Sequence, residues 1–163
     1  MMALWAVAGP RRAEIVSLDV GDYDAETGAV HILGKRHKER TVYVGNEAKQ
    51  AMGVWLAVRG LLPGPLFIPV HQTGKMRMGR LTTQAVYKIL KKRADQAGVK
   101  DVSPHDMRRT ALSNLIDKTD LATAQAIGGH ADPKTTARYD RRGERAKQAA
   151  AARMTVPYSD VWK

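Results

Sequence analysis

The sequence predicts a mainly helical α+β domain that contains one small, three-stranded antiparallel sheet. Apolar residues recur at helical spacing through most of the chain, whereas three short runs near the N-terminus are β-rich and separated by turn residues. The 163 residues, of which 44% are hydrophobic, suffice for one domain with a buried core. We therefore predict a single domain over residues 1–163, with a C-terminal helix and tail at 143–163.

Two short helices and the sheet are predicted in the first part of the chain. Met2 to Ala8 is predicted as the end of a buried helix and Arg12 to Leu18 as a second helix. Three β-rich runs follow, at Val20 to Tyr23, Ala29 to Leu33 and Arg40 to Val44. A Gly-containing turn joins the first two runs and a basic loop joins the last two, so we predict an antiparallel meander.

The rest of the chain is predicted as helices interrupted by one long loop. Residues 61–79 are rich in Gly and Pro and should be mostly loop, with a brief strand at 66–68. Thr82 or Thr83 is the expected cap of an amphipathic helix, and Ser103, followed by a proline, is the expected cap of the next. The predicted helices cover 46–58, 83–97, 104–116, 121–127, 133–140 and 143–154.

The charge balance predicts an anionic partner. Lys and Arg number 27 against 16 Asp and Glu, which leaves a formal net charge of +11. Nucleic acid is the partner we expect first and a membrane surface the second. The absence of cysteine excludes disulfides, cysteine-bound metals and thiol nucleophiles, and it fits a reducing cytoplasm. The apolar residues 1–8 are too few for an export signal or a membrane span.

One constellation of residues indicates phosphate chemistry. His105 and Arg108 are three residues apart near the start of a predicted helix, where backbone N–H groups and the helix dipole also favour an anion. Gly128-Gly129-His130 predicts a tight turn that carries an imidazole, and Tyr139 follows nine residues later. Each of these residues alone would be read as an ordinary surface or core side chain. Their combination predicts a site.

Together with Gly9-Pro10-Arg11-Arg12-Ala13-Glu14 and the Gly34-Lys35 loop, this constellation resembles the tyrosine recombinases, the site-specific integrase family of phages, plasmids and bacterial chromosomes. The resemblance covers most of the chain and implies an integrase-type catalytic domain. It implies six catalytic residues, Arg11, Lys35, His105, Arg108, His130 and Tyr139, with Glu14 as the buried acid that supports the first of them. The chain departs from the family pattern at Pro10, Ala13, Arg36 and Gly128, positions that affect turn shape and packing more than the reacting groups.

The implied chemistry accounts for the types of residue. A phosphodiester gains negative charge on its non-bridging oxygens during attack, and two guanidinium groups, Arg11 and Arg108, neutralise that charge with paired donors. His130 would donate a further hydrogen bond. Tyrosine is mostly protonated near neutral pH, so Tyr139 needs help to attack the phosphorus.

His105 is the candidate base for that attack, and Lys35 is the candidate acid that protonates the departing 5′-oxygen. The resemblance implies a 3′-phosphotyrosyl intermediate on Tyr139 and a free 5′-hydroxyl. Because the covalent bond conserves the energy of the phosphodiester, rejoining requires neither ATP nor a metal. We expect no cofactor, and no cluster of carboxylates suggests a two-metal site.

Double-stranded DNA is the expected partner. General phosphate contacts are predicted for Arg36, Lys38, Arg40, Thr83 and Gln84. The resemblance also implies a homotetramer on DNA, assembled through the C-terminal helix, which could equally pack within its own chain. The family's N-terminal core-binding domain has no counterpart in this sequence and the first helix looks trimmed, so we expect a catalytic fragment. Such a protein would act in the prokaryotic cytoplasm, at the nucleoid.

The sequence is compatible with three classes of function. A recombinase that cleaves and rejoins DNA is favoured. A type IB topoisomerase would use similar Arg, Lys, His and Tyr chemistry to relax supercoils without strand exchange. A decayed or truncated integrase would be a basic DNA-binding module without activity, and RNA binding is remote because no stacking-aromatic motif is present.

Overall fold

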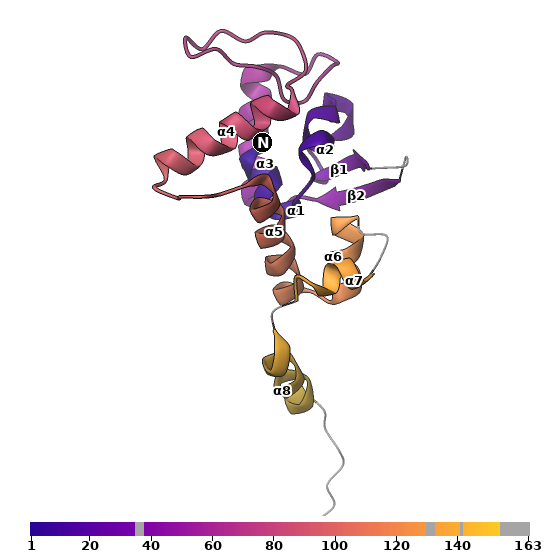
Figure 1. Ribbon diagram of the computed structural model, residues 1–163. Helices are drawn as coiled ribbons and strands as arrows, with labels where there is room; N and C mark the ends of the chain where they lie inside the picture. The colour runs from indigo at the N-terminus through magenta and orange to yellow at the C-terminus, as the bar shows by residue number, and fades with distance from the viewer. Residues whose placement is uncertain (35–37, 130–132, 141, 154–163) are drawn as a thin grey trace, which may run out of the picture.

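The computed structural model describes residues 1–34, 38–129, 133–140 and 142–153, and Figure 1 shows their arrangement. Helices dominate, and one small sheet lies beside the N-terminal helices. Within the described ranges the elements are α1 (Met2–Ala8), α2 (Arg12–Ser17), a 3₁₀ helix η1 (Val20–Asp22), β1 (Ala29–Leu33), β2 (Glu39–Tyr43), α3 (Asn46–Arg59), α4 (Thr83–Gln96), α5 (Pro104–Lys118), α6 (Leu121–Gly128), α7 (Pro133–Ala137) and α8 (Gly143–Arg153).

Side-chain caps begin three of the helices, α4, α5 and α6. Thr82 accepts a hydrogen bond from the backbone N–H of Ala85 (3.0 Å) at the start of α4. Ser103 and Asp106 form a capping box at the start of α5, in which each side chain accepts a hydrogen bond from the backbone N–H of the other, and Pro104 occupies the first helical position. Asp120 caps α6. These caps confirm the predicted starts of α4 and α5.

The sheet has two strands, so the predicted three-stranded meander is wrong in one strand. β1 and β2 pair antiparallel, with Val30 opposite Val42 and Ile32 opposite Arg40. Residues 20–22 form η1 instead, because the Asp22 carboxylate accepts a hydrogen bond from the Asp19 N–H (2.8 Å) and closes a tight turn. The first run therefore pairs with β1 through a single bridge. The predicted strand at 66–68 is also absent, although these three residues are buried.

The core lies between α1, the sheet and the faces of α3, α4 and α5. Leu4 and Trp5 of α1 are fully buried, and α1 packs along α5 and against α3. From β1 and β2, Val30, Ile32 and Val42 face this core. The packing brings the end of α1, the start of α2 and the middle of α5 together on the side where α6 meets β2.

The C-terminal helix lies apart from this body. In Figure 1, α8 extends beyond the far end of α5, away from the sheet and from α1 to α4. Its described side chains are exposed or half-exposed along its length. No helix in the described ranges is long and apolar enough to cross a membrane.

Candidate active site

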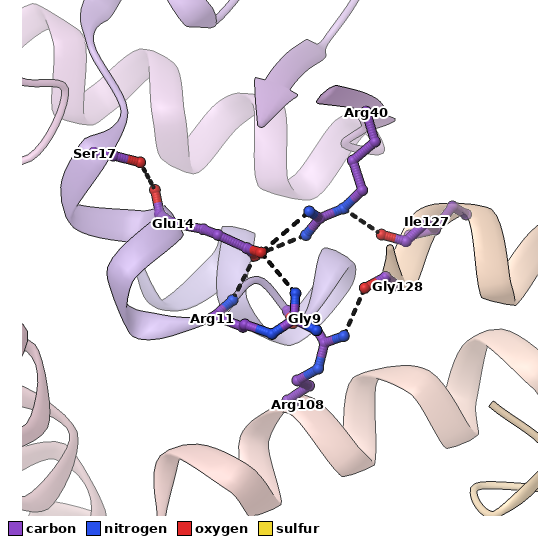
Figure 2. Close-up of polar contacts among 8 residues, drawn as sticks. All are labelled: Gly9, Arg11, Glu14, Ser17, Arg40, Arg108, Ile127 and Gly128. Carbon is purple, nitrogen blue, oxygen red and sulfur yellow. Dashed lines mark hydrogen bonds and ion pairs between the residues drawn. The ribbon is translucent and has the colours of Figure 1, made fainter. Parts of the chain in front are cut away.

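Arg108 lies at the centre of the candidate site. It is on α5 and is buried, with 7% of its surface exposed. Its Nη1 donates to the Gly9 carbonyl oxygen (2.6 Å) and its Nη2 to the Gly128 carbonyl oxygen (2.6 Å), as Figure 2 shows. The guanidinium thereby joins the end of α1 to the end of α6.

The backbone at Gly9 allows this close approach. Gly9 ends α1 in the left-handed region (φ 57°), and a Cβ there would lie 3.1 Å from the Cβ of Ala111 on α5. A side chain at this position would push α1 away from α5. The glycine therefore keeps the chain segment before Arg11 against the helix that carries Arg108.

Glu14, in the first turn of α2, caps the start of this helix and pairs with Arg11. The Arg11 backbone N–H donates to Glu14 Oε2 (2.8 Å), and its Nη1 donates to Glu14 Oε1 (2.8 Å). The Glu14 side chain is 4% exposed, whereas that of Arg11 is 44% exposed. The carboxylate thus orients a guanidinium that remains open to a ligand.

Glu14 also receives Arg40 from β2. Two guanidinium nitrogens of Arg40 donate to the two carboxylate oxygens, at 3.2 and 2.8 Å, and Arg40 Nε donates to the carbonyl oxygen of Ile127 (2.9 Å). Burial by itself would raise the pKa of Glu14, but the hydrogen bonds from Arg40 and Arg11 outweigh it and lower that pKa below its ordinary value. Glu14 is therefore charged at neutral pH.

The structure does not support a contact between Arg40 and a DNA phosphate. Its side chain is only 10% exposed, and protein groups hold the guanidinium on two sides. From the sequence we did not predict that protein groups hold the Arg40 side chain, although the strand pattern indicates its inward direction. Arg40 and Val42 are alternate residues of β2, and the buried Val44 follows this strand in the same alternation, which places Arg40 on the inward face.

Tyr139 and His105 lie near each other on the same side of α5. Their ring centroids are 6.4 Å apart and the rings are tilted by 47°. The Oγ of Ser113, two turns along α5, donates to the Tyr139 carbonyl oxygen (3.1 Å), which holds the residue after α7 against this helix. His105 is exposed at the start of α5, and Tyr139 is half-exposed.

The electrostatics of the group are strongly positive. The pKa of Arg108 is lowered to about 10, chiefly by burial and further by the charges of Arg11 and Arg40, while Glu14 and Tyr139 act in the opposite direction. Arg108 therefore remains a cation at neutral pH.

The other predicted site residues are either exposed or outside the described residues. Lys38 is exposed at the start of β2, and Thr83 and Gln84 are exposed in the first turn of α4. Lys35, Arg36 and His130 lie outside the described residues. Among the residues that the structure describes, no group of three or more His, Asp and Glu could hold a metal ion.

The fold is that of integrase and recombinase catalytic domains, as two solved structures show. The chain resembles the crystal structure of XerA recombinase with a TM-score of 0.75 and 23% identity, over 94% of this chain and 57% of that one. It resembles XerH recombinase, solved with a palindromic difH substrate, with a TM-score of 0.71 and 27% identity, over 92% of this chain and 44% of that one.

The model of the phage integrase family matches residues 1–145, and the chain belongs to that family. It is 35% identical over 143 residues to the tyrosine recombinase XerC of Corynebacterium glutamicum, covering 85% of this chain and 44% of the relative. It is 36% identical over 134 residues to XerC of Pseudomonas syringae, covering 81% of this chain and 44% of the relative. The chain thus spans less than half the length of these relatives. The predicted family is confirmed.

Proposed function

We propose that this chain is the catalytic domain of a site-specific tyrosine recombinase, which cleaves and rejoins double-stranded DNA through a 3′-phosphotyrosyl intermediate. One observation carries the proposal. The buried guanidinium of Arg108 binds the carbonyl oxygen of Gly9, two residues before Arg11, and the helix that carries Arg108 also carries His105, whose ring lies 6.4 Å from that of Tyr139. This is the arrangement that a phosphate needs when a tyrosine attacks it.

Arg11 and Arg108 are assigned the negative charge that develops on the phosphate. Arg108 is fixed by two backbone carbonyls, and Arg11 by Glu14, so neither guanidinium has to reorganise when the substrate arrives. Preorganised donors are the largest single contribution in many enzymes that stabilise an oxyanion. His130 is assigned a further hydrogen bond to the same phosphate.

The covalent step exchanges one phosphate ester for another. Tyr139 Oη attacks the phosphorus as His105 accepts its proton, the P–O5′ bond breaks, and Lys35 donates a proton to the departing 5′-oxygen. Rejoining reverses these transfers, with the 5′-hydroxyl of a second strand as the nucleophile. The 6.4 Å between the rings of Tyr139 and His105 supports their pairing after a small movement of the segment that follows α7.

Double-stranded DNA is the proposed partner, as the charge of +11 supports. Lys38, Arg36, Thr83 and Gln84 are proposed phosphate contacts. The chain is proposed to be a fragment of a longer recombinase, with the core-binding domain outside it. We further propose that α8 docks on a neighbouring copy in a tetramer on DNA, and that the protein acts at the bacterial nucleoid.

Covalent trapping tests the proposal. The probe is a pool of duplexes that carry a nick, with randomised sequence around it, so that cleavage releases a short strand and leaves the protein attached. Wild-type chain and Tyr43→Phe, which alters an exposed tyrosine of β2, are expected to form the adduct. Tyr139→Phe is expected to form none and to bind duplex DNA as wild type does. Trapped strands are counted by sequencing.

The alternatives give different results in the same assay. Wild-type binding without any adduct would refute the enzyme and support a DNA-binding module. An adduct combined with relaxation of supercoiled plasmid and no exchange between duplexes would support topoisomerase activity. An adduct that survives in Tyr139→Phe would move the nucleophile to another residue.

A further inference from the structure

The end of α6 is held by two arginines from different elements. The last carbonyls of a helix have no partners within it and form the negative end of its dipole. Arg40 takes the carbonyl of Ile127, and Arg108 takes the carbonyl of the next residue, Gly128. Two guanidinium groups therefore share one helix terminus, and the position of each depends on that of the helix end.

The same Arg40 is joined to Arg11 through Glu14. Oε1 of Glu14 accepts from Nη1 of both arginines, and Oε2 accepts from Arg40 Nη2 and from the Arg11 backbone N–H. Among the described residues, Arg11 and Arg40 are the cations that form ion pairs with this carboxylate. Removing Arg40 would take away two of these four hydrogen bonds and leave the carboxylate held by Arg11 alone, so the orientation of the Arg11 guanidinium would be less well defined.

Close packing fixes the Arg40 guanidinium in this position. Gly129, in the left-handed region with φ 62°, lies so close that an added Cβ would be 3.0 Å from Cδ, Nε and Cζ of Arg40. The guanidinium therefore rests against the turn that follows α6. In Figure 2, Arg40 lies between Glu14 and the end of α6. Arg40 therefore contacts both the carboxylate that binds Arg11 and the helix end that binds Arg108.

We propose that Arg40 is a positioning residue that sets the separation and orientation of Arg11 and Arg108. It acts through Glu14 on one side and through the end of α6 on the other, and it does not touch the DNA. The proposal rests on the proposed function for its consequence in catalysis. It replaces the phosphate contact that the sequence predicts for Arg40.

Kinetics and salt dependence separate the two roles. The variants are Arg40→Gln, Arg40→Lys and the control Arg93→Gln, which removes the same charge from an exposed position of α4. All are measured at a temperature where circular dichroism shows them folded. The dissociation constant for duplex DNA is measured against salt, and the rate of adduct formation is measured at saturating DNA with the nicked pool described above.

Arg40→Gln is expected to slow adduct formation at saturation on the order of 100-fold, because displacements of about 1 Å have effects of that size. Its affinity for DNA and the salt dependence should match those of Arg93→Gln. Arg40→Lys should remain slow, since the single nitrogen of an ammonium cannot span the acceptors that Nε, Nη1 and Nη2 of Arg40 reach separately. A weaker affinity with a salt slope reduced by about 0.9 would show a phosphate contact and overturn the proposal. So would a rate equal to that of Arg93→Gln.

An NMR measurement that requires no catalytic activity tests the positioning role of Arg40 separately from the proposed recombinase function. The Nε–H signals of Arg11 and Arg108 in ¹⁵N NMR spectra are assigned from Arg11→Lys and Arg108→Lys. Arg40→Gln should shift both signals and Arg93→Gln neither. If wild type forms no adduct, the proposed function fails and these shifts still decide the role of Arg40. Unshifted signals in Arg40→Gln would refute it.

Discussion

Glu14 binds two guanidinium groups of the candidate site, the exposed one of Arg11 and the largely covered one of Arg40. It accepts hydrogen bonds from Arg11 and Arg40 while its own side chain is almost fully buried. A buried carboxylate is stable as an anion only when it is paired, and its partners are in turn destabilised when it is removed. The ionisation of Glu14 should therefore change the free energy of unfolding of the whole chain.

Glu14→Gln should lower the free energy of unfolding by about 3 kcal/mol at pH 7, because it leaves Arg40 buried without its counter-charge. The pKa of Glu14 is lowered in the folded state, so its contribution is present above the ordinary value of 4.5 and is lost as pH falls below it. The difference between wild type and Glu14→Gln should thus narrow below pH 4.5. Urea denaturation of both proteins between pH 3 and 7 measures this difference in the free energy of unfolding.

Glu39→Gln is the matched control, since Glu39 is exposed on the same strand as Arg40. Its difference from wild type should stay within about 0.5 kcal/mol. A gap for Glu14→Gln that stays constant over the pH range would show that the carboxylate charge is not what stabilises the site.

Gly129 offers a second test at the scale of one residue. Gly129→Ala adds backbone strain at φ 62° and a Cβ 3.0 Å from the Arg40 guanidinium. Gly98→Ala adds similar strain at φ 67° but meets nothing within 4 Å. Thermal unfolding should show about 1 kcal/mol lost for Gly98→Ala and about 2–3 kcal/mol for Gly129→Ala. Equal losses would mean that the contact with Arg40 is not tight.

Among single residues, motif spacing predicts the candidates for catalysis, and it does not predict which side chains are packed inside the protein. Arg11, Arg108 and Tyr139 are recognisable because each belongs to a short pattern. Arg40 also belongs to a pattern. Its inward direction depends on the register of β2 against β1, which is a property of the paired strands and not of the loop motif.

At the scale of elements, local capping chemistry decided which predictions held. Ser103 with Pro104 marks the start of α5, and this start is confirmed. The first β-rich run, residues 20–23, has the apolar residues of a strand. The Asp22 carboxylate, however, accepts a hydrogen bond from the backbone N–H of Asp19 and closes a turn. Such a turn competes with strand pairing, and apolar content alone does not show which wins.

Ser103→Ala should destabilise the chain by about 1 kcal/mol, because α5 loses its capping oxygen and the Asp106 side of the box loses its hydroxyl partner. Thr110→Ala, at an exposed position of the same helix, should change stability by less than about 0.5 kcal/mol. Thermal unfolding of the two variants side by side gives the comparison. A Ser103→Ala value no larger than that of Thr110→Ala would mean that α5 is held by packing alone.

At the scale of the whole molecule, the two terminal helices differ in what they contribute. α1 inserts the fully buried Leu4 and Trp5 into the core, and it supplies the Gly9 carbonyl that Arg108 binds. α8 lies apart from the body and its described residues are mostly exposed. The sequence predicted both helices. It could not show this difference, because an alanine-rich helix suits burial against its own chain as well as against a partner.

Deleting the two terminal helices should therefore have opposite outcomes. A chain that ends at Arg142 loses exposed helix and little buried apolar surface, so its unfolding in the absence of DNA should stay within about 1 kcal/mol of wild type. A chain that begins at Gly9 loses Leu4 and Trp5, whose truncations alone are each worth about 3 kcal/mol or more, and it should not fold. Circular dichroism with thermal unfolding measures both. A large loss of stability on removing α8 would show that this helix packs within its own chain, and it would remove the ground for proposing that it docks on a neighbouring copy.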